Sequence, residues 1–315
     1  MVPRNRSRVQ HCPVLSGERI LVTGAAGRVG FPIARELAAQ GNTVYGLARY
    51  RDPAHREKVL AVGIEPVATD IHGATYDDLP DGITYVFHAG AALGPETADW
   101  LFALEVNALS TGRLLRAVAP TCRGFVYCST GSVYKYQGRR PLREDDPPGI
   151  HTTGNYSFSK IAGEAIVAHV AVEHGVPATI IRICSTYGPE GGAPWDRIAR
   201  MLAGEEIRLH PDAPNNYNPI YEDDQVRLGI RALEVASVPA LTVNWGGSET
   251  VSAEDYLAYA GSLLGVEPKI TYGDGAYHPL WPDVTKMHEV LGRCEVPWQD
   301  GFRRMLEARV PDRLG

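Results

Sequence analysis

Three glycines, each separated by two residues, follow a short apolar run near the start of the chain and constrain the fold most strongly. The run is Arg19 to Val22, and Gly24, Gly27 and Gly30 come directly after Thr23. Glycines at these places let the backbone turn tightly and approach a pyrophosphate, which the free N–H groups of a following helix stabilise. A strand, a glycine turn and a helix in this order predict a βαβ unit that binds a dinucleotide.

Apolar runs and helical stretches alternate through the next two hundred residues. Strands are expected at residues 43–48, 64–68, 85–88, 124–128, 177–183 and 240–245, and helices at about 30–40, 98–119, 157–169 and 251–265. This alternation predicts an α/β fold with a doubly wound parallel sheet. We find no internal repeat, low-complexity segment or clean linker.

A tyrosine and a lysine stand four residues apart at the start of the helix expected near residue 157. The spacing places Tyr156 and Lys160 on one face of the helix, one turn apart. A phenol has an unperturbed pKa of about 10, and a nearby ammonium lowers that pKa toward working pH. Ser129 and Thr130 end a buried strand, and the Thr130 hydroxyl is placed to hold a substrate oxygen while Tyr156 transfers the proton.

Together these motifs resemble those of the extended short-chain dehydrogenases/reductases, a group that includes NAD-dependent epimerases and dehydratases of nucleotide sugars. The matching segments are Thr23–Gly30, His88–Ala92, Asn107, Ser129-Thr130, Tyr156 with Lys160, and Tyr187-Gly188-Pro189.

The resemblance implies a Rossmann sheet with a small C-terminal substrate-binding lobe. The NAD(P)-binding domain would comprise residues 17–189 plus about 221–248, and the lobe residues 190–220 plus 249–315. Residues 1–16 are expected to be a flexible arm.

The resemblance also implies roles for individual residues. The catalytic set would be Thr130, Tyr156, Lys160 and Asn107, with Asn107 supporting an active-site water and the lysine. The cofactor would contact Gly24, Ala26, Gly27, Arg28, Val29, Gly30, Arg49, Asp70, Ile71, Ala89, Gly90, Ala91, Ser129, Tyr156, Lys160, Ile183 and Ser185. His88 is expected to be a packed strand residue, and no metal site is expected.

The end of the second strand favours NADP over NAD. NAD-specific members of the group usually carry an acidic residue there, which bonds the ribose 2′-hydroxyl. This chain has Ala48 followed by Arg49, and Arg28 stands in the glycine turn. Either arginine could pair with a 2′-phosphate through two parallel hydrogen bonds.

The expected reaction is reversible hydride transfer at a secondary alcohol or ketone carbon. Dehydratases of the group carry an Asp-Glu pair directly after the catalytic Thr, and here Gly131 and Ser132 stand in its place. Two arginines that clamp a sugar-nucleotide diphosphate in the group are replaced by the stretches Asn215–Tyr217 and Tyr277–Pro279. The alternative cations for a diphosphate are Arg182, Arg197, Arg200 and Arg208.

These departures favour a ketone reductase or alcohol dehydrogenase. Two alternatives stay open. One is a nucleotide-sugar 4-epimerase that retains its cofactor, and the other is a redox-sensing protein that binds a cofactor without turnover.

Composition argues against several other classes of protein. The chain has 315 residues and a formal net charge of −6, which disfavours nucleic-acid and anionic-membrane partners. No run of eighteen apolar residues and no secretory signal are present, and cysteines 12, 122, 128, 184 and 294 lack metal spacing. We therefore expect a cytoplasmic enzyme acting on a small molecule. The resemblance implies a homodimer formed through the helices after Asp99 and Ser157.

Overall fold

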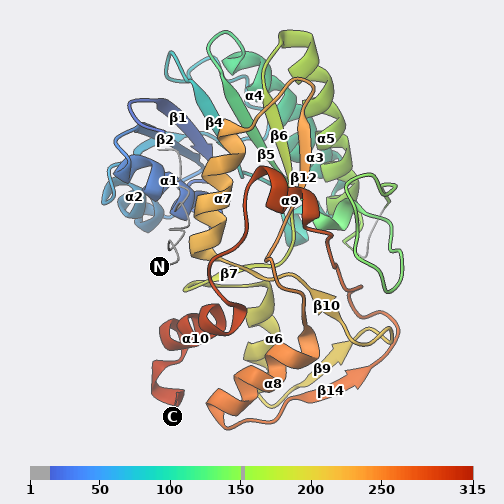
Figure 1. The fold of residues 1–315 in the computed structure, drawn as a ribbon. Coiled ribbons are helices and arrows are strands. Elements are labelled where there is room, and N and C mark those ends of the chain that lie inside the picture. Colours follow the sequence, from blue (N-terminus) through green and yellow to red (C-terminus); the bar gives the residue numbers. More distant parts are fainter. Residues whose placement is uncertain (1–14, 150–152, 315) are drawn as a thin grey trace, which may run out of the picture.

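The computed structural model describes residues 15–149 and 153–314, so most of the expected N-terminal arm lies outside the described residues (Figure 1). At its centre is a sheet of seven parallel strands in the order β12-β6-β5-β4-β1-β2-β3. The strands are β1 (Arg19–Thr23), β2 (Thr43–Ala48), β3 (Glu65–Ala68), β4 (Tyr85–His88), β5 (Gly124–Thr130), β6 (Ala178–Ile183) and β12 (Leu241–Trp245). The order reverses between β1 and β4, which is where ligands bind in sheets of this kind. The predicted doubly wound α/β fold is confirmed.

Side chains alternate along each strand, so both faces of this sheet carry apolar residues. Helices cover both faces. In β1, Ile20 faces one core and Leu21 faces the other. The first core includes apolar residues of α1 (Gly30–Ala39), α2 (Pro53–Leu60), α7 (Glu222–Glu234) and α9 (Thr285–Val290). The second includes residues of α4 (Ser110–Val118) and α5 (Asn155–His174).

The helix expected over residues 98–119 is present from Trp100 to Val118, but a π-helical turn that was not predicted lies in its middle. The 3₁₀ turn η1 (Gly94–Ala98) is followed by α3 (Trp100–Leu104), a π-helical turn η2 (Glu105–Leu109) and then α4. Within the π turn, the backbone oxygen of Asn107 accepts hydrogen bonds from the hydroxyls of Tyr127 (2.8 Å) and Thr111 (3.2 Å). Such π turns often mark functional sites.

A third apolar cluster forms the core of a lobe at the carboxyl ends of the sheet strands (Figure 1). Its elements are β7 (Thr186–Gly188), β8 (Gly191–Gly192), α6 (Ala193–Leu202), β9 (Glu206–Leu209), β10 (Asn216–Tyr217), β11 (Ile220–Tyr221), β13 (Val251–Ser252), α8 (Ala253–Leu264), β14 (Lys269–Tyr272) and α10 (Trp298–Arg309). The short turns η3 (Gly131–Val133) and η4 (Pro311–Arg313) complete the elements.

Ser252 caps the start of α8, because its hydroxyl accepts a hydrogen bond of 2.9 Å from the Asp255 N–H. None of the helices in the described part of the chain has the length and apolarity that a membrane span requires.

Candidate active site

The glycine turn after β1 leaves a bare backbone surface at the point where the strand order reverses. Gly24 has φ +66°, a conformation that strains any residue with a side chain. A Cβ atom on Gly30 would lie 2.4 Å from the Gly24 carbonyl oxygen, and one on Gly90 would lie 2.4 Å from Ile71. Neither position tolerates a side chain, so the backbone is free to approach a dinucleotide here.

His88 joins three elements behind this turn and is not placed to catalyse. Its Nδ1 lies 2.7 Å from the Thr23 hydroxyl, and its Nε2 lies 2.9 Å from the Thr111 hydroxyl. The Thr23 hydroxyl also accepts a hydrogen bond of 2.8 Å from the Gly90 N–H. Burial, helped by the charge of Lys160, lowers the pKa of His88 to about 3. The imidazole is therefore neutral and packed, as the sequence suggested.

A cavity of about 610 Å³ opens along the carboxyl ends of β1, β2, β4 and β5. It brings together nearly all of the residues predicted to contact cofactor or substrate. Those that line it are Gly24, Ala26, Gly27, Arg28, Val29, Gly30, Arg49, Asp70, Ile71, Ala89, Gly90, Ala91, Ser129, Thr130, Tyr156, Lys160 and Ile183.

Two predicted residues, Asn107 and Ser185, do not line the cavity. Ser185 adopts φ +57°. Ile183 and Thr186, which stand on either side of it in the sequence, both line the cavity.

One of the two arginines expected at the cofactor ribose has an acidic partner. Arg49 donates a hydrogen bond of 3.0 Å to Glu96, and both side chains are about two-fifths exposed. The other, Arg28, lines the same cavity. Glu96 also lines the cavity, so a carboxylate lies beside Arg49 although the end of β2 carries Ala48.

Tyr156 and Thr130 meet at the inner end of the cavity. Hydrogen bonding to Thr130 lowers the pKa of Tyr156, but burial is the larger effect and raises that pKa above its usual value. The lowering of the Tyr156 pKa that the sequence led us to expect is therefore outweighed in this structure, and Tyr156 keeps its proton at neutral pH.

Lys160 instead faces the end of β5. Its ammonium donates a hydrogen bond of 2.7 Å to the carbonyl oxygen of Cys128 and lies 4.7 Å from the centre of the Tyr127 ring. Only 2% of the residue is exposed, and burial lowers the pKa of Lys160 to about 8.

Asn107 connects the cavity wall at Ala92 to α5. Its amide donates to the Ala92 carbonyl oxygen (3.1 Å) and the Ser159 hydroxyl (2.9 Å), and its oxygen accepts the Ala92 N–H (2.8 Å). In this structure Asn107 therefore positions the backbone next to the cavity and contacts α5 beside Lys160.

Glu164, which sequence reasoning did not assign to the site, stands behind Ser129 together with Arg182, which it named only as a possible diphosphate cation. The Ser129 hydroxyl donates a hydrogen bond of 2.5 Å to Glu164, and Arg182 binds the same carboxylate through two bonds of 2.7 and 2.9 Å. The signals were present, because Glu164 follows Lys160 by one helical turn and Arg182 interrupts an apolar strand.

A second unassigned pair extends the site toward the lobe. The Ser132 hydroxyl lies 3.1 Å from the Thr130 hydroxyl and 3.3 Å from the Tyr277 hydroxyl. Tyr277 keeps 36% of its surface exposed although its hydroxyl reaches this buried pair, so its ring borders open space next to the catalytic residues. No sequence signal beyond the missing family arginine pointed to Tyr277.

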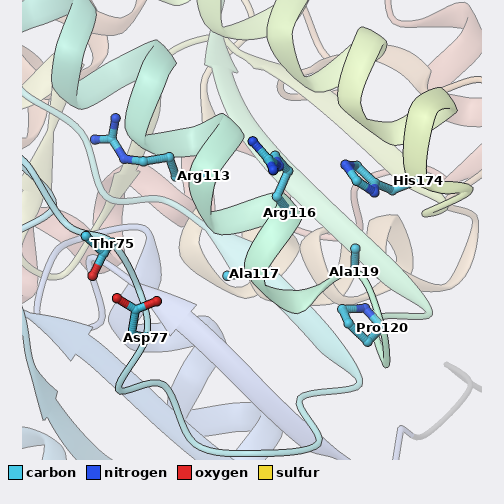
Figure 2. Close-up of a pocket in the computed structure, with 8 residues that line it drawn as sticks. All are labelled: Thr75, Asp77, Arg113, Arg116, Ala117, Ala119, Pro120 and His174. Atoms are coloured by element: carbon cyan, nitrogen blue, oxygen red, sulfur yellow. The ribbon is translucent and has the colours of Figure 1, made fainter.

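A separate hollow lies at the opposite edge of the sheet, between the carboxyl ends of α4 and α5 (Figure 2). Arg113, Arg116 and His174 line it together with Asp77. It shares no residue with the cavity above. Among the described residues, no group of three His, Cys, Asp or Glu side chains could hold a metal ion.

Residues 20–246 match the model of the NAD dependent epimerase/dehydratase family. The chain is 25% identical to the UDP-N-acetyl-alpha-D-glucosaminuronate decarboxylase of Bacillus cytotoxicus, over 92% of this chain and 97% of the relative. It is 27% identical to the dTDP-4-dehydro-6-deoxy-D-allose reductase of Streptomyces bikiniensis (91% and 94% covered) and to the UDP-glucose 4-epimerase of Mycolicibacterium smegmatis (92% and 97%). The fold is similar to that of MoeE5 in complex with UDP-glucuronic acid and NAD, with a TM-score of 0.78 and 25% identity over 93% of this chain and 99% of that one.

Proposed function

Because the chain belongs to the NAD dependent epimerase/dehydratase family of extended short-chain dehydrogenase/reductase enzymes, we propose that it is a nucleotide-sugar epimerase that retains NAD. The observation that carries the proposal is that Thr130 and Tyr156 line the same end of a cavity whose other end is a glycine cradle. It puts a proton donor beside the place where a nicotinamide would lie.

The glycine cradle fits a dinucleotide, because side chains at Gly30 and Gly90 would collide with their neighbours and the backbone is left bare. We propose that Gly24, Gly27 and Gly30 hold the pyrophosphate, and that Lys160 holds the nicotinamide ribose. When bound, NAD accepts a hydride from a secondary alcohol carbon and returns it to the resulting ketone.

The residues of this chain handle the accompanying proton. As the hydride leaves the carbon, the alcohol proton passes to the Tyr156 oxygen, and the same proton returns to the ketone oxygen when the hydride comes back. Thr130 holds that oxygen by a hydrogen bond. Tyr156 must be a phenolate to accept the proton, and burial opposes this state by raising its pKa. A positive charge brought closer by a bound nicotinamide ring or by Lys160 would favour the phenolate.

The relatives do not support the ketone reductase that the sequence favours. They agree better with the alternative, a nucleotide-sugar epimerase. Relatives over nearly the full length of the chain include an epimerase and a decarboxylase of UDP-sugars. The reductase among the relatives also acts on a nucleotide sugar. A ketone without a nucleotide has no counterpart among these relatives.

The preference for NADP is likewise not supported. The MoeE5 complex contains NAD. Arg49, which was to hold the 2′-phosphate, is instead paired with Glu96. A carboxylate at the same edge of the cavity repels a 2′-phosphate and can bond a ribose hydroxyl. We therefore propose NAD as the cofactor.

We propose a homodimer formed by α3 and α5. Trp100 and Leu101 of α3 are 52% and 58% exposed, and Phe158 and Val172 of α5 are 36% and 55% exposed. Several large apolar side chains on two adjacent helices favour a partner surface. The domain division expected from the sequence is also kept as a proposal, supported by the separate apolar cluster around α6, α8 and α10.

The experiment is to denature the purified protein, identify any released nucleotide, and incubate the intact protein with UDP-glucose, UDP-glucuronic acid and UDP-N-acetylglucosamine. We expect released NAD and conversion of at least one sugar to its 4-epimer without added cofactor. An empty protein that consumes NADPH with a ketone would instead support the reductase.

A further inference from the structure

Arg197 on α6 stands in the lobe among tyrosines and has no acidic partner. Its Nη1 donates a hydrogen bond of 2.9 Å to the Tyr256 hydroxyl, and its Nη2 donates one of 2.9 Å to the Tyr217 hydroxyl. The guanidinium also lies 5.0 Å from the centre of the Tyr217 ring. Within the described residues, no carboxylate oxygen comes within 4.0 Å of Arg197.

Other arginines with little exposure in this protein are arranged differently. Arg182, Arg227 and Arg231 each pair with a carboxylate, at 2.7, 2.6 and 2.9 Å. Removing a cation from water without an opposite charge is costly, and neutral phenols compensate only part of that cost. A ligand that brings an anion to Arg197 would supply the missing charge.

The carboxylate that lies in this neighbourhood is held elsewhere. Glu254 raises the pKa of both Tyr217 and Tyr256, so it is near them, although burial is the main cause of both shifts. Its oxygens accept hydrogen bonds from the Asn215 N–H (2.9 Å) and side-chain amide (3.3 Å). Glu254 therefore anchors the chain before β10 and leaves Arg197 unneutralised.

A polar path connects Arg197 with the catalytic residues. Thr130 contacts Ser132, and Ser132 contacts Tyr277. Burial is the main cause that raises the pKa of Tyr277 to about 12, while the bond to Ser132 and the charge of Arg197 oppose the shift. The charges of Arg197 and the Tyr277 hydroxyl therefore influence each other, and Tyr277 contacts the Ser132 hydroxyl beside Thr130.

Arg197 keeps unused donors for a ligand. A guanidinium has five N–H groups in a planar fork, and the two tyrosines account for two of them. Because each tyrosine hydroxyl fixes one Nη atom, the orientation of the fork is set before a ligand arrives. Such a preorganised fork suits a phosphate or a carboxylate, which accept two parallel bonds.

We propose that Arg197, oriented by Tyr217 and Tyr256, binds the anionic group of the substrate. This inference rests on the proposed function, since it assumes a substrate that reaches from Thr130 into the lobe. Two anionic groups of such a substrate could bind there: a diphosphate next to the sugar or a carboxylate on the sugar. Tyr217 lies in one of the stretches where the sequence lacks an expected diphosphate arginine, and α6 supplies the cation from a different direction.

The test measures binding by calorimetry for wild type, Arg197→Gln and the control Arg200→Gln. Arg200 lies three residues further along α6, is more than half exposed and pairs with Glu205. The ligands are uridine, UDP, UDP-glucose, UDP-glucuronic acid and inorganic pyrophosphate. Thermal melting of each variant verifies folding, and Arg197→Lys serves as a second variant that keeps the charge.

If Arg197 holds the diphosphate, Arg197→Gln weakens the binding of UDP by about ten- to a hundred-fold and leaves the affinity for uridine unchanged. If Arg197 holds a sugar carboxylate, the same substitution weakens the binding of UDP-glucuronic acid relative to that of UDP-glucose and leaves the affinity for UDP unchanged. Arg197→Lys should recover part of either loss. Tyr217→Phe, which removes one hydroxyl that fixes the fork, should cause a smaller loss of the same kind.

Unchanged affinities in Arg197→Gln, or equal losses in Arg200→Gln, would overturn the proposal. If wild type binds no uridine compound, the proposed function fails, and the pyrophosphate measurement alone decides about Arg197. Pyrophosphate binding that Arg197→Gln abolishes would then support an anion site, and binding insensitive to that change would refute it.

Discussion

The ammonium of Lys160 donates a hydrogen bond of 2.7 Å to the carbonyl oxygen of Cys128, the residue before Ser129 at the end of β5. The lysine thus connects the catalytic helix to the strand that carries Thr130. It does so as an almost completely buried side chain that has no carboxylate partner in the described part of the chain. A cation in this setting is costly to the folded protein unless a ligand compensates it.

This burial predicts a pH-dependent stability. The pKa of Lys160 is lowered from 10.5 to about 8 in the folded protein. Between these values the unfolded chain binds a proton that the folded protein does not, so the stability contribution rises as pH increases through 8. Relative to Lys160→Met, wild type should gain on the order of 1 kcal/mol in free energy of unfolding from pH 7 to pH 9.

Urea unfolding of both proteins at the two pH values, at equal nucleotide content, measures this difference. Tyrosine and cysteine ionisations are common to both proteins and cancel in the comparison. If the two proteins change in parallel, the ammonium is not destabilised by burial.

The pairing of Arg49 with Glu96 predicts how cofactor choice can be altered. Glu96→Gln removes the carboxylate, frees Arg49 and takes away a repulsion from a 2′-phosphate. NADP affinity should rise by several-fold, and NAD affinity should stay equal or fall. Titration of both cofactors into nucleotide-free protein measures the ratio, with Glu57→Gln on α2 as the control. A ratio that does not move would place cofactor choice away from this ion pair.

The exposed apolar residues of α3 and α5 predict the oligomeric state. Leu101→Asp introduces a charge at a side chain that is 58% exposed, so the monomer fold should survive while association is lost. Light scattering after gel filtration should show dimers for wild type and monomers for this variant. Leu60→Asp on α2, at a residue 46% exposed, is the control and should stay dimeric. A monomeric wild type contradicts the proposed dimer.

Local patterns predicted much of this molecule because they act over a few residues. Gly24, Gly27 and Gly30 specify a turn through backbone conformation, and β4 begins and ends at the predicted residues, Tyr85 and His88. The helix around Asn107 was predicted but its π turn was not, and the Asn107 backbone oxygen there accepts a hydrogen bond from Tyr127, twenty residues away on β5.

Long-range pairs account for the other differences. Nothing near Arg49 in the sequence indicates that it will pair with Glu96. The sequence therefore predicted an NADP site without taking the Glu96 carboxylate into account. Likewise, Arg197 was one of four candidate cations, and only the fold separates it from Arg182, which pairs with Glu164. The Tyr156–Thr130 contact was predictable because each residue sits at a position that its own element fixes.

The central claim is that Tyr156 transfers the proton while retained NAD carries the hydride. The most direct measurement is epimerisation of the best UDP-sugar by wild type and Tyr156→Phe, with bound NAD quantified in each sample. The substitution removes the hydroxyl and keeps the ring, so NAD content should be unchanged while turnover falls by about 10²- to 10⁴-fold. Near-parental turnover by Tyr156→Phe with full NAD content would contradict the account.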